Sequence, residues 1–189
     1  MTTTIETTLN GVDRATMFGT LDAIKENPGL GRFQFRVENK WIDGAHNRST
    51  IKSFYGAGGE DATRTTEFVL DAGEPQILLG SDTGPNPGEA MLHALAGCLT
   101  TSLVYVAAAR GVKLTEVTSR LEGNMDVRGA LGLDDSYRNG FEDISITFNV
   151  KGESDEEELQ ALLDRASARS AVFDMVRNGV PIKLELANG

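Results

Sequence analysis

Cys98 is the one cysteine of the chain, and it is the first residue whose chemistry could be catalytic. It lies in the stretch GPNPGEAMLHALAGCLTTSLVYVAAARG, residues 84–111, which has the pattern of a buried helix. A thiolate is a nucleophile and can be oxidised, whereas a buried thiol often only packs as a small apolar group. The residue type alone leaves both interpretations of Cys98 open.

The surroundings of Cys98 on the predicted helix are apolar with two hydroxyl groups. Residues three, four or seven apart share a helix face. On that spacing the neighbours of the thiol are Met91, Leu95, Thr101 and Ser102. Such a face can line a small pocket. Because Glu89 and His93 are not at facing positions, a reactive Cys98 needs a cation from another element to stabilise its thiolate.

Other chemistry is poorly represented in the sequence. One cysteine and two distant histidines, His46 and His93, form no zinc ligand set with recognisable spacing. The acids at 155–158 are explained by the dipole of the helix that they begin. We therefore expect no metal and no cofactor.

Length and charge limit the remaining classes of protein. The 189 residues carry a formal net charge of -10, which disfavours nucleic acid and anionic membranes as partners. The N-terminus lacks the basic and apolar regions of a signal peptide, and a single cysteine excludes an intrachain disulfide. These features predict a cytoplasmic protein that binds neither membrane nor nucleic acid.

The first half of the chain is predicted to hold one helix and two pairs of strands. Asn10 is expected to cap a helix that ends before Asn27. Alternating segments at 33–42 and 47–56 flank a polar turn and predict a hairpin. The segments at 66–71 and 75–80 predict a second pair of short strands.

The second half begins with the long helix that carries Cys98. The helix starts at Pro87 and ends at Arg110-Gly111. The elements expected after it are strands at 112–127 and 142–151, a helix capped by Ser154, a short helix at 171–179 and a strand at 180–187. Strands in runs rather than in one-to-one alternation with helices predict an α+β fold with largely antiparallel sheets. A helix as hydrophobic as 90–109 needs sheet on more than one side, or a partner subunit.

The segments NPGEAMLHALAGC (86–98) and RSAVFDMVRNGVPI (169–182) resemble the OsmC/Ohr superfamily of osmotically inducible and organic hydroperoxide resistance proteins. The resemblance covers about residues 32–187. It implies an N-terminal extension with one helix at 1–31 and an OsmC-like domain at 32–189. It also implies an intertwined homodimer, in which antiparallel sheets wrap around long central helices and the active sites lie at the subunit interface.

The resemblance also implies roles for single residues. Cys98 matches the cysteine that attacks a peroxide, and Arg48 is the best match to the arginine that stabilises its thiolate, with Arg36 as the alternative. Otherwise Arg48 is a solvated charge on a hairpin. Gly88 stands where a glutamate holds that arginine. Glu89 is the next residue, and the helix dipole also explains it.

The second cysteine of the family has no counterpart in this chain. Ser170 stands ahead of Ala-Val-Phe where that cysteine is expected, and as a serine it either caps the helix that follows or takes the place of the lost thiol. Serine forms no disulfide, so an external thiol has to complete any catalytic cycle.

Two functions follow from this resemblance. The first is a one-cysteine, thiol-dependent peroxidase that reduces organic hydroperoxides. The alternative is a non-catalytic binder of a small hydrophobic ligand in the dimer-interface pocket, which would tolerate Cys98→Ser. The pocket residues expected in either case are Met91, Leu95, Ser102, Ser170, Val172 and Phe173. A purely structural or partner-binding role is the third possibility, and no exposed apolar helix or basic patch in the sequence supports it.

Overall fold

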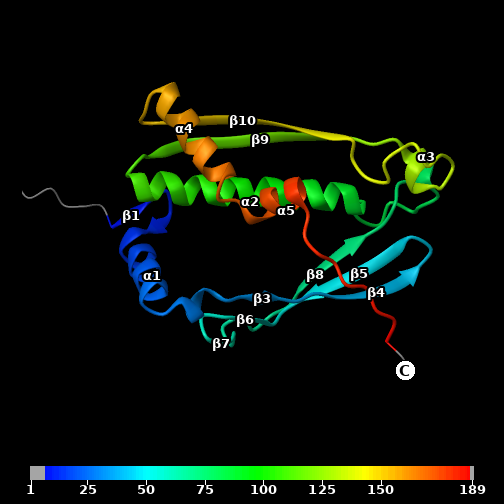
Figure 1. Cartoon of the computed structure of the whole chain (residues 1–189), viewed down its shortest axis with the longest axis horizontal. Coiled ribbons are helices and arrows are strands. Elements are labelled where there is room, and N and C mark those ends of the chain that lie inside the picture. Colours follow the sequence, from blue (N-terminus) through cyan, green and yellow to red (C-terminus); the bar gives the residue numbers. More distant parts are fainter. Residues whose placement is uncertain (1–6, 188–189) are drawn as a thin grey trace, which may run out of the picture. The chain divides into compact units, whose positions relative to one another are not determined.

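The computed structural model describes residues 7–187, and these fall into two compact units. The first unit holds Asp13–Met91 with Thr7, and the second holds Thr8–Val12 with residues 92–187. Figure 1 shows the elements of each unit. The boundary between the units falls within the first turns of the long helix α2 (Pro87–Arg110). This helix confirms the one predicted around Cys98.

The first helix, α1 (Arg14–Glu26), starts later than the sequence suggested. Its N-cap is Asp13, whose side chain accepts a hydrogen bond from the backbone N–H of Thr16 at 2.8 Å. The prediction that Asn10 caps this helix is wrong. Asn10 has a φ of 53° and forms, with Gly11, the turn between the short strands β1 (Thr8–Leu9) and β2 (Val12–Asp13). Left-handed backbone at both positions suits an Asn-Gly hairpin turn.

The Asn10 side chain joins two segments of the second unit through hydrogen bonds. Its amide donates to the carbonyl of Val112 at 2.9 Å, and its oxygen accepts from the N–H of Leu114 at 2.9 Å. These bonds join the chain before α1 to the start of the strand that follows α2.

The sheets of the first unit confirm the predicted hairpin and correct the second strand pair. The strands are β3 (Gln34–Phe35), β4 (Glu38–Asp43), β5 (His46–Ile51), β6 (Phe54–Gly56), β7 (Gly59–Glu60) and β8 (Phe68–Ala72). They form two antiparallel sheets of order β3-β6-β7 and β4-β5-β8. The strand predicted at 75–80 is instead a 3-10 turn, η2 (Gln76–Leu78). Another 3-10 turn, η1 (Pro28–Gly31), follows α1. Leu79, with a φ of 64°, ends η2 in a left-handed conformation that no strand accommodates.

The second unit is built on a long two-stranded ribbon, β9 (Leu114–Asn124) and β10 (Asp143–Gly152), which lies along α2 in Figure 1. The pairing is antiparallel, with Ile146 opposite Leu121 and Val150 opposite Val117. Along β10, exposed and half-buried residues alternate, which confirms that the apolar residues predicted for this strand share one covered face.

The elements after β9 were predicted with one omission and two errors. The short helix α3 (Val127–Ala130), capped by Asp126, was not predicted. Helix α4 (Glu156–Ser167) is capped by Asp155 rather than by Ser154, because the Asp155 carboxylate accepts from the N–H of Glu158 at 2.9 Å. The described residues 180–187 form no regular secondary structure, so the predicted strand is absent from the single chain. A strand requires a neighbour with which to pair.

Helix α5 (Ala171–Asn178) matches the prediction closely. Ser170 is its N-cap, and its hydroxyl oxygen accepts from the N–H of Phe173 at 3.3 Å. Gly179, with a φ of 72°, ends it.

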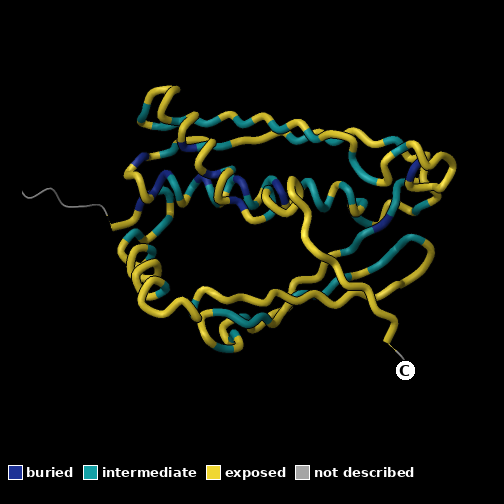
Figure 2. The backbone as a smooth tube through the Cα atoms, viewed as in Figure 1, coloured by how far each residue is buried: buried dark blue, intermediate teal, exposed yellow. Residues whose placement is uncertain are grey.

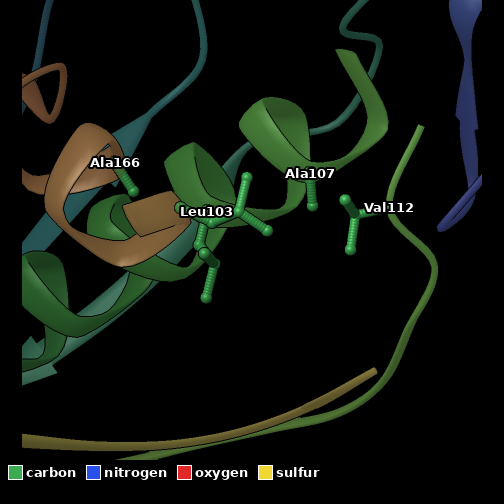
Figure 3. Packing of buried hydrophobic residues seen from close by; sticks show 5 residues of the cluster. Leu103, Ala107, Val112 and Ala166 are labelled. Atoms are coloured by element: carbon green, nitrogen blue, oxygen red, sulfur yellow. The ribbon is translucent and has the colours of Figure 1, made fainter. Parts of the chain in front are cut away.

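The core of the second unit lies between α2, the ribbon and α4. Figure 3 shows Leu103 and Ala107 of α2 beside Ala166 of α4 and Val112, and Leu162 completes this buried cluster. Figure 2 shows the buried residues of α2 along the helix, and the described ones are Leu95, Leu99, Leu103, Ala107 and Ala108. By length and composition α2 also passes as a membrane span, but its buried residues are those of a core helix.

Candidate functional site: Cys98 at the start of α5

Cys98 lies on α2 between the core and the surface. Its neighbours Leu95 and Leu99 are buried, and Cys98 itself is half-buried. The first residues of α5 reach its sulfur from a point 72 residues later in the sequence. Two helices of the second unit therefore meet at the thiol.

Four hydrogen-bond donors converge on the Cys98 sulfur. The Ser170 hydroxyl donates to Sγ at an Oγ–Sγ distance of 3.1 Å. The backbone N–H groups of Ala171 and Val172, in the first turn of α5, and the Ser102 hydroxyl, one turn further along α2, are the other donors that lower the pKa of the thiol. The positive end of the α5 dipole thus faces the sulfur.

These donors determine the acidity of the thiol. Burial raises the pKa of Cys98, because it disfavours the charged form, but the hydrogen bonds from Ser170, Val172, Ala171 and Ser102 lower it by more. The net pKa lies below the ordinary value of 9.0. A thiol that is acidic and partly accessible has the properties of a nucleophile and of an oxidisable group.

The other predicted pocket residues differ in their surroundings. Ser102 and Ser170 contact the sulfur, and Phe173 is half-buried and binds the Ser170 oxygen through its N–H. Leu95 is buried in the core. Met91 is half-buried in the part of α2 that belongs to the first unit.

Arg48 belongs to the first unit, where a carboxylate holds it. Its Nε donates to Asp71 Oδ1 at 2.8 Å, and a terminal nitrogen donates to Oδ2 at 3.2 Å. His46 Nε2 lies 2.8 Å from the same Asp71 Oδ1. The hydrogen bonds from Arg48 first, and from His46 second, lower the pKa of Asp71 to about 2. The pairing of Arg48 with Cys98 stays a prediction, since the two residues lie in different units.

Glu89 forms a capping box at the start of α2. Its carboxylate accepts from the N–H of Asn86 at 2.9 Å, and the Asn86 side chain accepts from the N–H of Glu89 at 2.8 Å. The carboxylate that contacts Arg48 is that of Asp71. Arg36, the alternative arginine, is held at 2.8 and 2.7 Å by the two oxygens of Glu60.

Sequence reasoning missed part of this chemistry. Asp71 ends a strand-like segment, FVLD, and its pairing with Arg48 follows from the register of β5 with β8, which the sequence does not specify. The donors at Ala171 and Val172 are backbone groups, so no residue type reveals them. Among residues 7–187, no group of three or more His, Cys, Asp or Glu side chains could hold a metal ion.

Comparison with known proteins identifies the family. A family model described as OsmC-like protein matches residues 80–185, more than half of the chain. The chain belongs to the OsmC-like protein family. The resemblance seen in the sequence is therefore confirmed. No curated protein matches the OsmC-like chain in a sequence search.

Solved structures show the same fold at low sequence identity. An OsmC-like protein from Mycoplasma pneumoniae superposes with a TM-score of 0.59 at 14% identity, over 77% of this chain and 88% of that one. An osmotic stress and detoxification response protein from Psychrobacter arcticus gives 0.56 at 13% identity, over 77% and 90%. An organic hydroperoxide resistance protein from Legionella pneumophila gives 0.51 at 16% identity, over 79% and 93%. These likenesses establish an α+β OsmC-like fold.

The acidity of Asp71 predicts a pH-dependent stability. Because its pKa is lower in the folded than in the unfolded protein, the ionised carboxylate stabilises the fold above its ordinary value of 3.8, and this contribution is lost as the pH falls to about 2. Asp71→Asn should therefore lower the melting temperature at pH 7, and the difference from wild type should vanish near pH 2. Asp43→Asn, at an exposed position on β4 of the same sheet, is the control. A difference for Asp71→Asn that persists unchanged into acid would contradict the assignment.

Proposed function

We propose that this OsmC-like protein is a thiol-dependent peroxidase that reduces organic hydroperoxides, with Cys98 as its nucleophile. The observation that carries the proposal is the convergence of four hydrogen-bond donors on the Cys98 sulfur. A merely packed thiol needs no such donors, whereas a thiolate is stabilised by each of them. The name of the Legionella pneumophila structure, an organic hydroperoxide resistance protein, is consistent with this substrate class.

In the first step the Cys98 thiolate attacks one oxygen of the peroxide O–O bond. A sulfur–oxygen bond forms as the O–O bond breaks, so the sulfur loses two electrons and becomes a sulfenic acid. The hydroperoxide gains those electrons and leaves as an alcohol after its oxygen takes up a proton. The donors that hold the thiolate are also placed to bind the anionic form of the sulfenic acid.

The second step requires a thiol from outside the chain, because the sequence contains one cysteine. An external thiol displaces the sulfenic oxygen as water and forms a mixed disulfide with Cys98. A second thiol group then releases Cys98 as a thiolate and leaves the reductant as a disulfide. We place the protein in the cytoplasm, where reducing thiols are available.

We assign Arg48 the role of electrostatic partner for the thiolate. Asp71, rather than Glu89, is the carboxylate that orients its guanidinium, since Asp71 holds it through two hydrogen bonds and Glu89 binds the backbone of Asn86. A guanidinium oriented in this way keeps its charge at every pH at which a thiolate forms.

We propose that the chain acts as a homodimer. In the most apolar stretch of α2, 22% of the residues are buried in the single chain. The tail after α5 presents apolar side chains at alternate positions, Ile182, Leu184 and Leu186, which are 87%, 95% and 91% exposed. An extended apolar surface of this kind is typical of a protein interface, and a second copy supplies the partner that the predicted strand at 180–187 lacks.

The dimer predicts a mass in solution of twice that of one chain, measured by light scattering on a size-exclusion column. Leu184→Asp should weaken the dimer, because it introduces a charge into the apolar side of the tail, while Glu185→Asp on the opposite side should not. A wild-type protein that elutes with the mass of one chain at micromolar concentration would refute the homodimer.

The peroxidase predicts turnover of tert-butyl or cumene hydroperoxide with dithiothreitol in excess. Cys98→Ser should abolish turnover, since a hydroxyl does not ionise at neutral pH. Arg48→Ala should lower kcat/KM by about 10-fold or more, as expected for loss of a group that stabilises an anionic centre. Arg36→Ala is the matched control and should retain turnover. Dimedone should trap a sulfenic acid on Cys98 in the wild type, detected by intact mass.

A wild type that is as inert as Cys98→Ser, with Cys98 still reduced after exposure to peroxide, would contradict the peroxidase. Binding of a hydrophobic ligand that survives Cys98→Ser would then favour the alternative function of a non-catalytic binder.

A further inference from the structure

Ser170 is a fully satisfied buried hydroxyl at the junction of α4 and α5. It is 1% exposed. Its oxygen accepts from the N–H of Phe173 at 3.3 Å, and its proton is donated to Cys98 Sγ at 3.1 Å. The first bond caps α5, and the second has no part in capping because an N-cap requires only an acceptor.

Comparison with the other helix starts shows that this second bond is specific to α5. The described helices α1, α3 and α4 are capped by the aspartates Asp13, Asp126 and Asp155, and α2 starts at the amide of Asn86. An ionised aspartate has no proton to donate and would place a negative charge beside the sulfur. Serine at α5 serves the cap equally well and also supplies a donor.

We propose that Ser170 is the positioning residue of the Cys98 thiolate, which it holds and stabilises by donating its hydroxyl proton to the sulfur. This inference rests on the proposed function in that it assigns the group that prepares the nucleophile. In the peroxidase reaction this proton stays on the Ser170 oxygen throughout. Ser170 therefore acts through the thiolate and does not itself react with the peroxide.

The other groups at the sulfur are neutral. They are the Ser102 hydroxyl from α2 and the N–H groups of Ala171 and Val172 from α5. The charged residues beside Ser170 in the sequence, Arg169 and Asp174, are exposed, and among the described residues no ionisable side chain is a source of the change in the acidity of the thiol. Arg48, the proposed partner from the first unit, is unchanged in every variant below. Differences between the pH curves of those variants therefore report on these donors.

The test is the rate at which iodoacetamide alkylates Cys98 as a function of pH, followed by intact mass. Ser170→Ala should shift the midpoint of this curve upward by about one unit, so that alkylation below the midpoint slows about 10-fold. Ser170→Gly should do the same, although glycine costs an N-cap only a few tenths of a kcal/mol. Ser170→Thr, which keeps both the acceptor and the proton, should restore the wild-type midpoint.

Two controls separate the donor from the cap. Asp155→Ala removes the cap of α4 and should leave the midpoint unchanged, and Ser102→Ala, which alters no cap, should shift it upward. A Ser170→Ala protein that loses stability on thermal unfolding but keeps the wild-type midpoint would overturn the inference, and Ser170 would then only cap α5. A rate that changes equally at every pH would also overturn it, because that result reports access to the thiol.

The alkylation curve does not depend on peroxide turnover. If the midpoint shifts as expected while the wild type fails to reduce hydroperoxides, the role of Ser170 stands and the proposed peroxidase function fails. If turnover is normal and the midpoint does not move, the peroxidase stands and the role of Ser170 fails.

Discussion

The hydrogen bond from Ser170 to Cys98 links two helices that are distant in the sequence, and the candidate site depends on it. For the bond to form, the start of α5 must reach the middle of α2. Helix α4 makes this possible, because it ends three residues before Ser170 and packs on α2 through Leu162 and Ala166. The buried cluster of the second unit is therefore a structural condition for the chemistry of the thiol.

The site balances two opposed effects on one sulfur. Burial beside Leu95 and Leu99 makes the thiolate costly, and donors from Ser170, Ser102 and α5 offset that cost. All four donors are neutral. In the proposed reaction an arginine supplies a positive charge in addition, and a separate carboxylate, Asp71, fixes the orientation of its guanidinium.

The sequence predicted most elements whose signal is local. The long helix around Cys98, the alternating strand β10 and the cap of α5 by Ser170 each follow from a pattern within a few residues. Some errors were local, such as the cap of α4, which is Asp155 instead of its neighbour Ser154. Two others arose where distant partners decide the structure. Asn10 has the side chain of a helix cap, but its partners are Val112 and Leu114, about a hundred residues away. Segment 180–187 has the pattern of a strand but no neighbour among the described residues.

The candidate site was predicted in the same uneven way. Cys98 was identified as the one cysteine of the chain, and the family resemblance suggested its role and pointed to Ser170, but their contact depends on the packing of α4 against α2. The partnership of Arg48 with Asp71 depends on the register of β5 with β8. A shift of one residue in that register would abolish the partnership. Glu89 was considered for the role of that carboxylate because it follows Gly88, where the family resemblance places a glutamate, whereas its side chain binds the backbone of Asn86.

The central claim is that the fold makes Cys98 an acidic thiol, and the most direct measurement is its ionisation in the folded protein. The ultraviolet absorbance of the thiolate can be titrated with pH in the wild type, with Cys98→Ser as the blank for the tyrosines. The account predicts a midpoint below the ordinary thiol value of 9.0. A midpoint at or above that value would show that burial outweighs the four donors and that Cys98 is a packed thiol rather than a nucleophile.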